Sequence, residues 1–311
     1  MKQDAPLLKD IADGPDGGRA FWQDAQDGVR VRIGHWPAAK TRGTVLLLPG
    51  RTEYIEKYGL TARDLVQLGY GTLTIDWRGQ GLSDRILVDV LPGHVGRFHD
   101  YQTDLDAMLQ LAAALDLPRP WHMLAHSMGG AIGLRGALRG LPFATCAFTA
   151  PMWGIAIKPT LRPVAWLLSW ASRQIGLGHL YAPGATRDSY VLSEPFETNA
   201  LTRDREMHAY MVTQLQAHPE LALGGPSLHW LFEALRECRT LASLPSPDLP
   251  SLTFLGSQEE IVDIARIDSR IARWPGARLE KVEGARHELL METPATRANV
   301  MRQLAAFWDA H

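Results

Sequence analysis

Cysteine is scarce in this sequence. Only two of the 311 residues are cysteines, Cys146 and Cys238, and they lie far apart in apolar or helical contexts. Two distant thiols in such contexts favour buried free cysteines over a disulfide framework. The sequence therefore predicts a protein of a reducing compartment.

Long hydrophobic segments are also missing. The first residues, MKQDAPLLKDIADGPDGG, lack the uninterrupted apolar core of a signal peptide. No run approaches the roughly 18 apolar residues that a membrane span needs. We therefore expect a cytoplasmic protein, and peripheral contact with the inner face of the membrane remains open.

The chain has no excess of charge of either sign. It has 32 lysine and arginine residues against 34 aspartate and glutamate residues, and its formal net charge is -2. Nucleic-acid binding is therefore not expected. Four histidines between residues 94 and 126 come without an HExxH motif or clustered carboxylates, so no metal site is expected. Nothing in the sequence indicates another cofactor.

Short apolar runs alternate with helical patterns along much of the chain. The runs end in turn residues, as the buried strands of a mostly parallel sheet do. They are TVLLLPG, YGTLTIDWRG, WHMLAHS, FATCAFTAP, LPSLTFLGS and ARLEKVEGARH. Upstream of them, Asp27-Gly28 is typical of a hairpin turn between two antiparallel strands. The pattern predicts a doubly wound α/β fold.

The alternation stops in the middle of the sequence. Between the strand near Ala150 and the strand near Leu252, about a hundred residues show helical patterns and no convincing strand. The proline-rich segment SLPSPDLPS indicates the return to the sheet. We predict a catalytic domain of residues 1–151 and 240–311, with a helical cap inserted at residues 152–239.

The stretch LAHSMGGAIG places Ser127 one residue past the end of a predicted strand. Ligands of open α/β sheets bind beyond the carboxyl ends of the strands, so Ser127 is a candidate nucleophile on a strand-to-helix turn. Gly129 and Gly130 leave room for such a turn. The alternative is that Ser127 only caps the following helix, and the stretch by itself does not separate the two interpretations.

A nucleophilic serine needs an imidazole to accept its proton and a carboxylate to orient that imidazole. His287 follows the last predicted strand at the same sheet edge. The carboxylates after the preceding strand are Glu259, Glu260 and Asp263. We choose Glu259 because it falls on the turn after Gly256, whereas Asp263 can cap the next helix.

Taken together, these segments resemble the α/β-hydrolase family, in particular its lysophospholipase and monoacylglycerol lipase branch. The matching pieces are LLLPGRTEYIEKYG, DWRGQGLSD, GHVGRFHDYQTDLDAML, AHSMGGAI, NALTRD, GSQEEIVD and GARHELLME. The resemblance implies a mostly parallel, eight-stranded sheet with helices on both faces. It also implies a catalytic triad of Ser127, Glu259 and His287. Two residues depart from the family pattern, because Glu259 stands where aspartate is commoner and Ala125 replaces the first glycine of the elbow.

Acyl transfer also requires hydrogen-bond donors for the oxyanion, each worth roughly 3 to 4 kcal/mol. The backbone N–H of Met128, the residue after the nucleophile, supplies one donor. The resemblance assigns the second donor to the backbone N–H of Arg51, although relatives usually have His-Gly where this chain has Pro49-Gly50. The guanidinium of Arg51 has two interpretations, a structural contact or a contact with a polar substrate head group.

Two further segments carry a choice between structure and function. DWRGQGLSD is rich in glycine but lacks the Lys-Ser/Thr ending of a nucleotide P-loop, so we interpret it as structural. The apolar segments of the cap either pack on the catalytic domain or form an acyl-chain groove or membrane-facing lid. The candidate pocket residues are Trp153, Trp166, Trp170 and Trp230.

The sequence thus predicts a serine ester hydrolase that acts through an acyl-enzyme on lysophospholipids or monoacylglycerols. Its expected partner is a small acyl ester, and the sequence leaves the oligomeric state open. One alternative is a serine aminopeptidase of the same fold, because the elbow does not distinguish an ester from an amide. The other is a hydrolase-like ligand receptor without catalytic activity.

Overall fold

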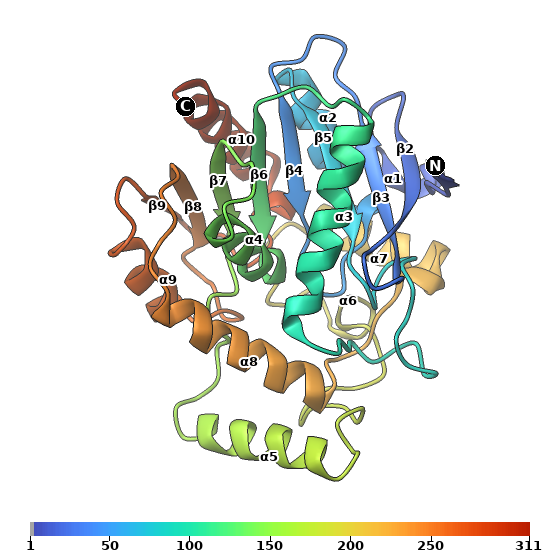
Figure 1. Ribbon diagram of the computed structural model, residues 1–311, viewed down its shortest axis with the longest axis vertical. Coiled ribbons are helices and arrows are strands. Elements are labelled where there is room, and N and C mark those ends of the chain that lie inside the picture. The colour runs from blue at the N-terminus through green and yellow to red at the C-terminus, as the bar shows by residue number, and fades with distance from the viewer. Residues whose placement is uncertain (1–2) are drawn as a thin grey trace.

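The computed structural model describes residues 3–311 and is built around one nine-stranded sheet (Figure 1). The strand order across the sheet is β1-β2-β3-β5-β4-β6-β7-β8-β9. The strands are β1 (Gln3–Ala5), β2 (Arg19–Asp24), β3 (Arg30–Trp36), β4 (Thr44–Leu48), β5 (Gly71–Asp76), β6 (Trp121–His126), β7 (Thr145–Thr149), β8 (Ser251–Gly256) and β9 (Arg278–Val282).

The sheet is antiparallel at its N-terminal edge and parallel elsewhere. The pairs β1/β2, β2/β3 and β3/β5 are antiparallel, whereas the pairs from β5/β4 to β8/β9 are parallel. The expected mostly parallel α/β fold is confirmed. The sheet has nine strands instead of the expected eight, because the short β1 pairs with the outer edge of β2.

The turn between β2 and β3 confirms the hairpin expected at Asp27-Gly28. Gly28 has a φ of 83°, a region that favours glycine, and the Ala25 N–H donates to the Val29 carbonyl at 2.8 Å. The hairpin directs β3 back along β5, which adds an antiparallel edge to the parallel part of the sheet.

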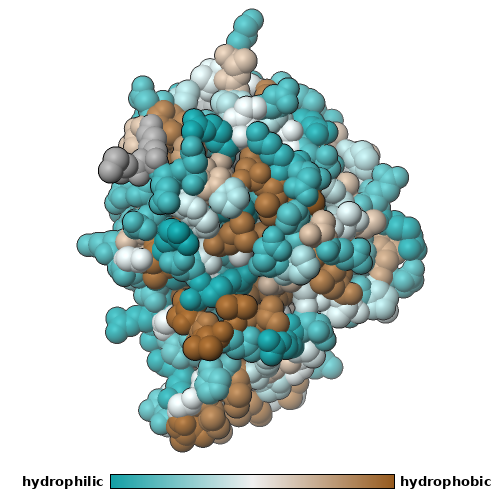
Figure 2. Space-filling view, turned by 90° about the vertical axis from the view of Figure 1, so that its right-hand side faces the viewer, coloured by the Kyte–Doolittle hydropathy of each residue, from teal (hydrophilic) through white to brown (hydrophobic). Residues whose placement is uncertain are grey.

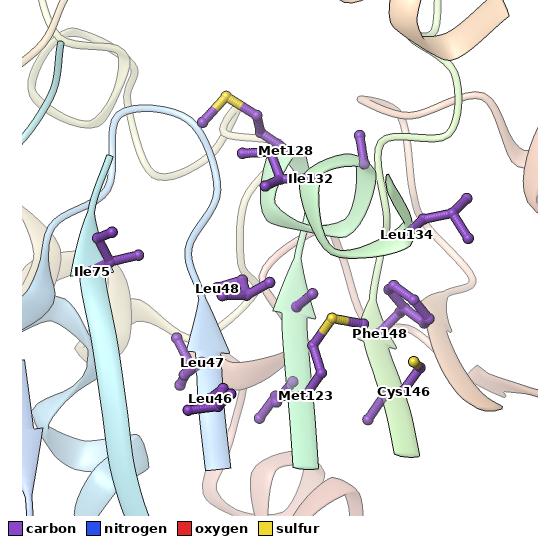
Figure 3. Close-up of a cluster of buried hydrophobic side chains, with 14 of the residues drawn as sticks. Leu46, Leu47, Leu48, Ile75, Met123, Met128, Ile132, Leu134, Cys146 and Phe148 are labelled. Carbon is purple, nitrogen blue, oxygen red and sulfur yellow. The ribbon is translucent and has the colours of Figure 1, made fainter. Parts of the chain in front are cut away.

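The parallel strands inside the sheet, β4 to β8, are buried on both faces, which explains their continuous apolar sequences. All residues of β4 and β6 are buried. Figure 3 shows Leu46, Leu47 and Leu48 of β4 beside Met123 of β6, with Phe148 of β7 next to them. These side chains form part of one hydrophobic core that supports the first turn of the helix after β6.

Helices cover both faces of the sheet. The α-helices are α1 (Lys9–Ala12), α2 (Gly59–Gln67), α3 (Tyr101–Ala114), α4 (Met128–Leu138), α5 (Arg162–Gln174), α6 (Tyr190–Ser193), α7 (Arg205–Ala217), α8 (Leu228–Ser243), α9 (Ile264–Ile271) and α10 (Pro294–Asp309). The 3-10 helices are η1 (Ile55–Tyr58), η2 (Phe98–Asp100), η3 (Pro219–Leu221) and η4 (Leu289–Met291). Helices α3 and α4 lie in front of the sheet in Figure 1, and α2 and α10 lie behind it.

The segment between β7 and β8 contains α5, α6, α7, η3 and α8 and no strand, as expected from its sequence. Helices α5 and α8 pack side by side beyond the end of the sheet toward which the arrowheads of β4 and β6 point (Figure 1). The segment therefore lies at the carboxyl edge of the sheet. The cap boundaries at residues 152 and 239 stay a prediction.

No helix within residues 3–311 is long and apolar enough to cross a membrane.

Candidate active site

Ser127 lies at a sharp turn between β6 and α4. Its backbone has φ 48° and ψ -116°, a strained conformation for a residue with a side chain. Three backbone hydrogen bonds hold it: its N–H donates to the Thr149 carbonyl at 3.1 Å, and its carbonyl accepts from Gly130 and Met152, each at 2.8 Å. The Ser127 side chain makes no capping hydrogen bond to the described helix, which argues against the interpretation as a helix cap.

The glycines after Ser127 allow this turn to lie against neighbouring backbone. A Cβ atom on Gly129 would lie 2.1 Å from the carbonyl oxygen of Leu48, and a Cβ atom on Gly130 would lie 2.5 Å from Cβ of Pro151. Both distances are too short for a side chain. The small residues expected at the elbow are therefore required by its packing, whereas Ala125 is accommodated within the buried strand β6.

His287 and Glu259 come from the turns after two neighbouring strands, β9 and β8. The Nδ1 atom of His287 lies 2.8 Å from Oε2 of Glu259, and both side chains are buried. The other oxygen of Glu259 accepts from the backbone N–H groups of Ile261 at 2.6 Å and Val262 at 3.0 Å. The Glu259 carboxylate is thus held in place. Because Nδ1 of His287 faces this carboxylate, Nε2 is the ring nitrogen that can accept or donate a proton on the substrate side.

The pKa of Glu259 is lowered although the residue is buried. Burial alone would raise this pKa, but the adjacent His287 and the N–H groups of Ile261 and Val262 stabilise the charged form more strongly. An ionised carboxylate at this position would stabilise an imidazolium at His287.

The other two carboxylates considered from the sequence have different surroundings. Asp263 caps α9 by accepting from the Arg266 N–H at 3.3 Å, and it forms an ion pair with Arg162 at 2.8 Å. This confirms the expected capping role of Asp263. Glu260 is exposed and faces the cavity described next. Of the three carboxylates, the structure brings Glu259 into contact with His287.

Ser127 and His287 line the same cavity, which we call the inner cavity. Its volume is about 470 Å³, and most of its wall is apolar, with Met152, Ile155 and Trp230 among the lining residues. A second cavity of about 650 Å³, the outer cavity, lies against α5. Six residues line both cavities, which makes them adjacent. They are Arg51, Thr52, Ile155, Tyr190, Pro226 and Leu231.

The two backbone amides expected to bind an oxyanion belong to Met128, at the first turn of α4, and to Arg51, in the loop after β4. The amide of a first-turn residue has no partner within its own helix, which suits the Met128 N–H to donate to an external anion. The loop before Arg51 is held by Trp77, whose Nε1 donates to the Pro49 carbonyl at 2.9 Å, and by Gln80, whose Nε2 donates to the Gly50 carbonyl at 2.8 Å.

Trp77 and Gln80 belong to the segment DWRGQGLSD, which is structural as expected. In the same segment, Asp76 accepts from the N–H of Ile55 at 2.8 Å, and Arg78 forms an ion pair with Asp104 at 2.7 Å. The polar side chains of the segment are directed at neighbouring parts of the chain, which agrees with the structural interpretation.

A buried group of charges that the sequence did not indicate lies behind the candidate triad. The Nζ atom of Lys57 is 2.5 Å from Glu53 and 2.7 Å from Glu288. The Nε2 atom of His126 lies 3.4 Å from Glu288, and its Nδ1 lies 3.0 Å from Oγ1 of Thr149. The His126 ring is also 4.8 Å from the ring of His287. We call Glu53, Lys57, His126 and Glu288 the buried charge cluster.

Mutual pairing controls ionisation in the buried charge cluster. Burial would raise the pKa of Glu288, but Lys57 and His126 lower it well below its ordinary value. Burial would lower the pKa of His126, but Glu288 and Glu53 raise it. Since Glu288 follows His287 and His126 precedes Ser127, the cluster fixes the backbone on both sides of the candidate site.

Three members of this cluster, Glu53, His126 and Glu288, offer ligand atoms within 4.8 Å of one another. The ammonium group of Lys57 already contacts both carboxylates. It supplies the positive charge that a metal ion would bring, so the arrangement is explained without a metal.

The four tryptophans proposed from the sequence have different positions. Trp230 lines the inner cavity. Trp166 packs on Phe232 of α8 with ring centroids 5.7 Å apart, and Trp170 is exposed on α5. Neither lines a cavity with Ser127.

Trp153 lies in the core, and its assignment to the substrate pocket is corrected. Its ring contacts those of Phe148 and Trp274, and its Nε1 donates to the Gly130 carbonyl at 3.2 Å. It lines a different, smaller cavity on the side of Leu134 and Arg270. The side chain turns under α4 because the chain bends sharply after β7, which the sequence pattern does not reveal.

A strained serine at the carboxyl end of a parallel strand, beside a carboxylate-bound histidine, defines the class of serine hydrolases with an α/β-hydrolase fold. Residues 39–294 match the family described as serine aminopeptidase, S33. The chain belongs to this family. The resemblance noted from the sequence is thereby confirmed.

Relatives extend over almost the whole chain. Lysophospholipase L2 of Escherichia coli is 35% identical over 299 residues, which cover 92% of this chain and 86% of that protein. Phospholipase YtpA of Bacillus subtilis is 23% identical, with coverages of 89% and 98%. A solved structure of the monoglyceride lipase from Saccharomyces cerevisiae superposes with a TM-score of 0.71 at 21% identity, covering 93% of this chain and 94% of that one. The last match shows the shared fold.

Proposed function

We propose that this protein is a serine ester hydrolase that cleaves lysophospholipids or monoacylglycerols through an acyl-enzyme. Ser127 is the nucleophile, His287 the general base and acid, and Glu259 the carboxylate that orients the imidazole. The backbone N–H groups of Met128 and Arg51 bind the oxyanion. The hydrogen bond between His287 and Glu259, with His287 and the strained Ser127 lining one cavity, carries this proposal.

The reaction takes place in two halves. Oγ of Ser127 attacks the ester carbonyl while Nε2 of His287 accepts the hydroxyl proton, and the two amides stabilise the oxyanion. The tetrahedral intermediate then expels the alcohol, which takes the proton from His287. In the second half, His287 removes a proton from water, the resulting hydroxide attacks the acyl-enzyme, and the fatty acid leaves as Ser127 regains its proton.

The apolar inner cavity supports a lipid ester as the substrate. A fatty acyl chain loses unfavourable contact with water when it enters a cavity lined by residues such as Met152, Ile155 and Trp230. The names of two relatives, a lysophospholipase and a phospholipase, point to the same substrate class.

A substrate panel tests the proposal. It contains lysophospholipids, monoacylglycerols, short p-nitrophenyl esters and aminoacyl amides, and a fluorophosphonate probe reports on the serine. We expect labelling that is lost in Ser127→Ala, and turnover of the monoacyl lipids. Activity confined to aminoacyl amides would identify an aminopeptidase, and an intact protein that never reacts with the probe would be a ligand receptor.

We also propose that residues 152–239 form a cap that contacts a lipid surface. Leu167, Trp170 and Ile175 are 64%, 50% and 70% exposed, and hydrophobic residues gather at the end of the molecule where Figure 1 places α5 (Figure 2). Exposed aliphatic and aromatic side chains on an amphipathic helix bind the boundary between lipid head groups and acyl chains. These exposed side chains support peripheral contact with a membrane, and we propose that the contact is at the inner, cytoplasmic face.

A further inference from the structure

Arg51 has a position that its backbone role does not explain. Its side chain lines both the inner cavity, which contains Ser127, and the outer cavity against α5. A group of the substrate that extends from the reacting ester toward the outer cavity therefore passes the guanidinium.

The guanidinium of Arg51 has few partners in the described chain. Its Nη1 donates to the Gly224 carbonyl at 3.1 Å, and its Cζ lies 5.6 Å from the centre of the Trp230 ring. Within residues 3–311 no carboxylate forms an ion pair with it. An arginine has five N–H donors, so most of them remain for a ligand.

Other arginines without a carboxylate partner show what a purely structural guanidinium looks like. Arg85 donates to three backbone carbonyls, those of Gly79, Gly81 and Glu220. Arg270 donates to two backbone carbonyls and to the hydroxyl of Ser246. Both arginines are satisfied by the chain around them, whereas Arg51 has one such acceptor.

Arg51 keeps its charge in this position. Burial lowers its pKa to about 10, so the guanidinium is protonated at neutral pH. Lys57, the lysine that lines the inner cavity, is already paired with Glu53 and Glu288. Arg51 is therefore the cation that can bind an anionic group of a substrate at the junction of the cavities.

We propose that the Arg51 guanidinium binds the phosphodiester of a lysophospholipid head group and makes the enzyme prefer lysophospholipids to monoacylglycerols. This inference rests on the proposed function and selects between its two substrates. A planar guanidinium binds two phosphate oxygens with parallel hydrogen bonds. In a 1-acyl lysophospholipid, only the glycerol separates the ester from the phosphate, so a residue beside the oxyanion is well placed to contact both.

The experiment compares two substrates with the same acyl chain, 1-palmitoyl lysophosphatidylcholine and 1-palmitoylglycerol, in the same nonionic detergent micelles. The quantity measured is the ratio of their kcat/KM values. We expect Arg51→Gln to lower this ratio about tenfold or more, since it removes a charge-assisted contact but keeps the backbone amide. Arg51→Lys keeps the charge without the planar fork, so its ratio should fall in between.

Arg187→Gln is the matched control. Arg187 lies between Thr186 and Asp188, which line the outer cavity, but it is exposed and pairs with Asp89 at 3.4 Å, so its loss should leave the ratio unchanged. If Arg51 only supports the fold, Arg51→Gln will lower kcat/KM equally for both substrates. A ratio that does not change in Arg51→Gln, whether or not kcat/KM falls for both substrates, would overturn the phosphate site.

A competition assay separates a lipid head group from free phosphate. Hydrolysis of p-nitrophenyl butyrate is measured with glycerophosphocholine or inorganic phosphate as inhibitor. We expect glycerophosphocholine to inhibit the wild-type protein competitively and Arg51→Gln much less. Inhibition by inorganic phosphate alone would contradict the head-group assignment.

Different results would contradict the proposed lipid substrate and the proposed role of Arg51. If the wild-type protein hydrolyses p-nitrophenyl butyrate but neither palmitoyl lipid, the proposed lipid substrate is wrong and the head-group site falls with it. If it hydrolyses both lipids and the ratio does not respond to Arg51→Gln, the lipid hydrolase stands and only the role of Arg51 is wrong.

Discussion

The carboxyl edge of the sheet and helix α5 differ in the kind of side chain that each one buries or exposes. At the sheet edge, charged side chains such as Lys57 and Glu288 are buried and paired at 2.7 Å. On α5, apolar side chains such as Leu167 and Trp170 are exposed. Both regions thus hold side chains in an environment that disfavours them, since charged groups are removed from water at the sheet edge and apolar groups are exposed to water on α5.

The difference agrees with what each region is proposed to contact, a reacting ester at the sheet edge and a lipid surface at α5. A catalytic group must keep its geometry to within a fraction of an ångström, and a paired buried charge has one favourable arrangement. A surface that meets lipid needs no fixed partner and gains free energy from any apolar contact. Mutations should therefore have large, geometry-dependent effects at the sheet edge and small, additive effects on α5.

The largest effect is expected for Ser127→Ala. Removal of the nucleophile should lower kcat by roughly 10⁴- to 10⁶-fold. Stability should change little, because the Ser127 side chain makes no capping hydrogen bond. Steady-state kinetics with a p-nitrophenyl ester and a urea titration check both statements, and substantial residual turnover by a folded variant would exclude Ser127 as nucleophile.

The second largest effect on activity is expected for Glu259→Gln. The amide cannot stabilise an imidazolium, and it disturbs the orientation of His287, so kcat should fall roughly 10³- to 10⁴-fold. The matched variants are Glu260→Gln and Asp263→Asn, which change a neighbouring carboxylate without touching His287. Loss of activity in Asp263→Asn alone, with the fold intact, would show that the acid is assigned wrongly.

Lys57→Met tests whether the pairing of buried charges stabilises the carboxyl edge of the sheet. It leaves Glu53 and Glu288 buried without their shared ammonium group, which should lower the free energy of unfolding by about 3 to 5 kcal/mol. Urea denaturation at neutral pH measures this change. A variant as stable as the wild type would mean that the cluster is not held together by Lys57.

The pH dependence of the same variant gives a sharper measurement. The lowered pKa of Glu288 contributes stability that is present above its ordinary pKa of 4.5 and is lost as pH falls through the folded-state value. Without Lys57 the folded-state pKa of Glu288 rises. The fall in the free energy of unfolding between neutral and acidic pH should therefore be smaller in Lys57→Met than in the wild type, because less of the Glu288 contribution is present to be lost.

The smallest effect is expected on the cap. The double variant Leu167→Ser, Trp170→Ser should reduce partitioning onto phospholipid vesicles roughly five- to tenfold, because it removes apolar contact area, and it should leave the unfolding free energy nearly unchanged. Val88→Ser is the control, since Val88 is fully exposed but lies outside the cap. Vesicle co-sedimentation measures the partitioning, and equal effects of the two variants would contradict a specific lipid-facing helix.

The sequence pattern predicted more of the main chain than of the side-chain environment. The strands of the parallel part of the sheet, the hairpin at Gly28 and the helical insertion follow from periodicity and turn residues, which are local properties. The contact of His287 with Glu259 was also accessible, because consecutive parallel strands end at one edge.

The features that the sequence did not predict concern the burial of side chains. Glu53 and Lys57 have the i, i+4 spacing of an exposed helix pair, and nothing in the sequence indicates that both are buried against Glu288. Trp153 was grouped with the cap tryptophans, although it packs in the core. A residue type shows what a side chain can do, but its exposure depends on residues more than a hundred positions away.

The sequence by itself determined the α/β fold, the elbow at Ser127 and the pairing of His287 with Glu259, because these depend on local conformation and on the order of strand ends. Only the tertiary structure decided which charges are paired and which remain available. Lys57 is neutralised by carboxylates from two distant segments, whereas Arg51 meets a single carbonyl at the junction of the cavities. The physical reason is that desolvation and pairing are set by three-dimensional neighbours, and the chain order does not specify them.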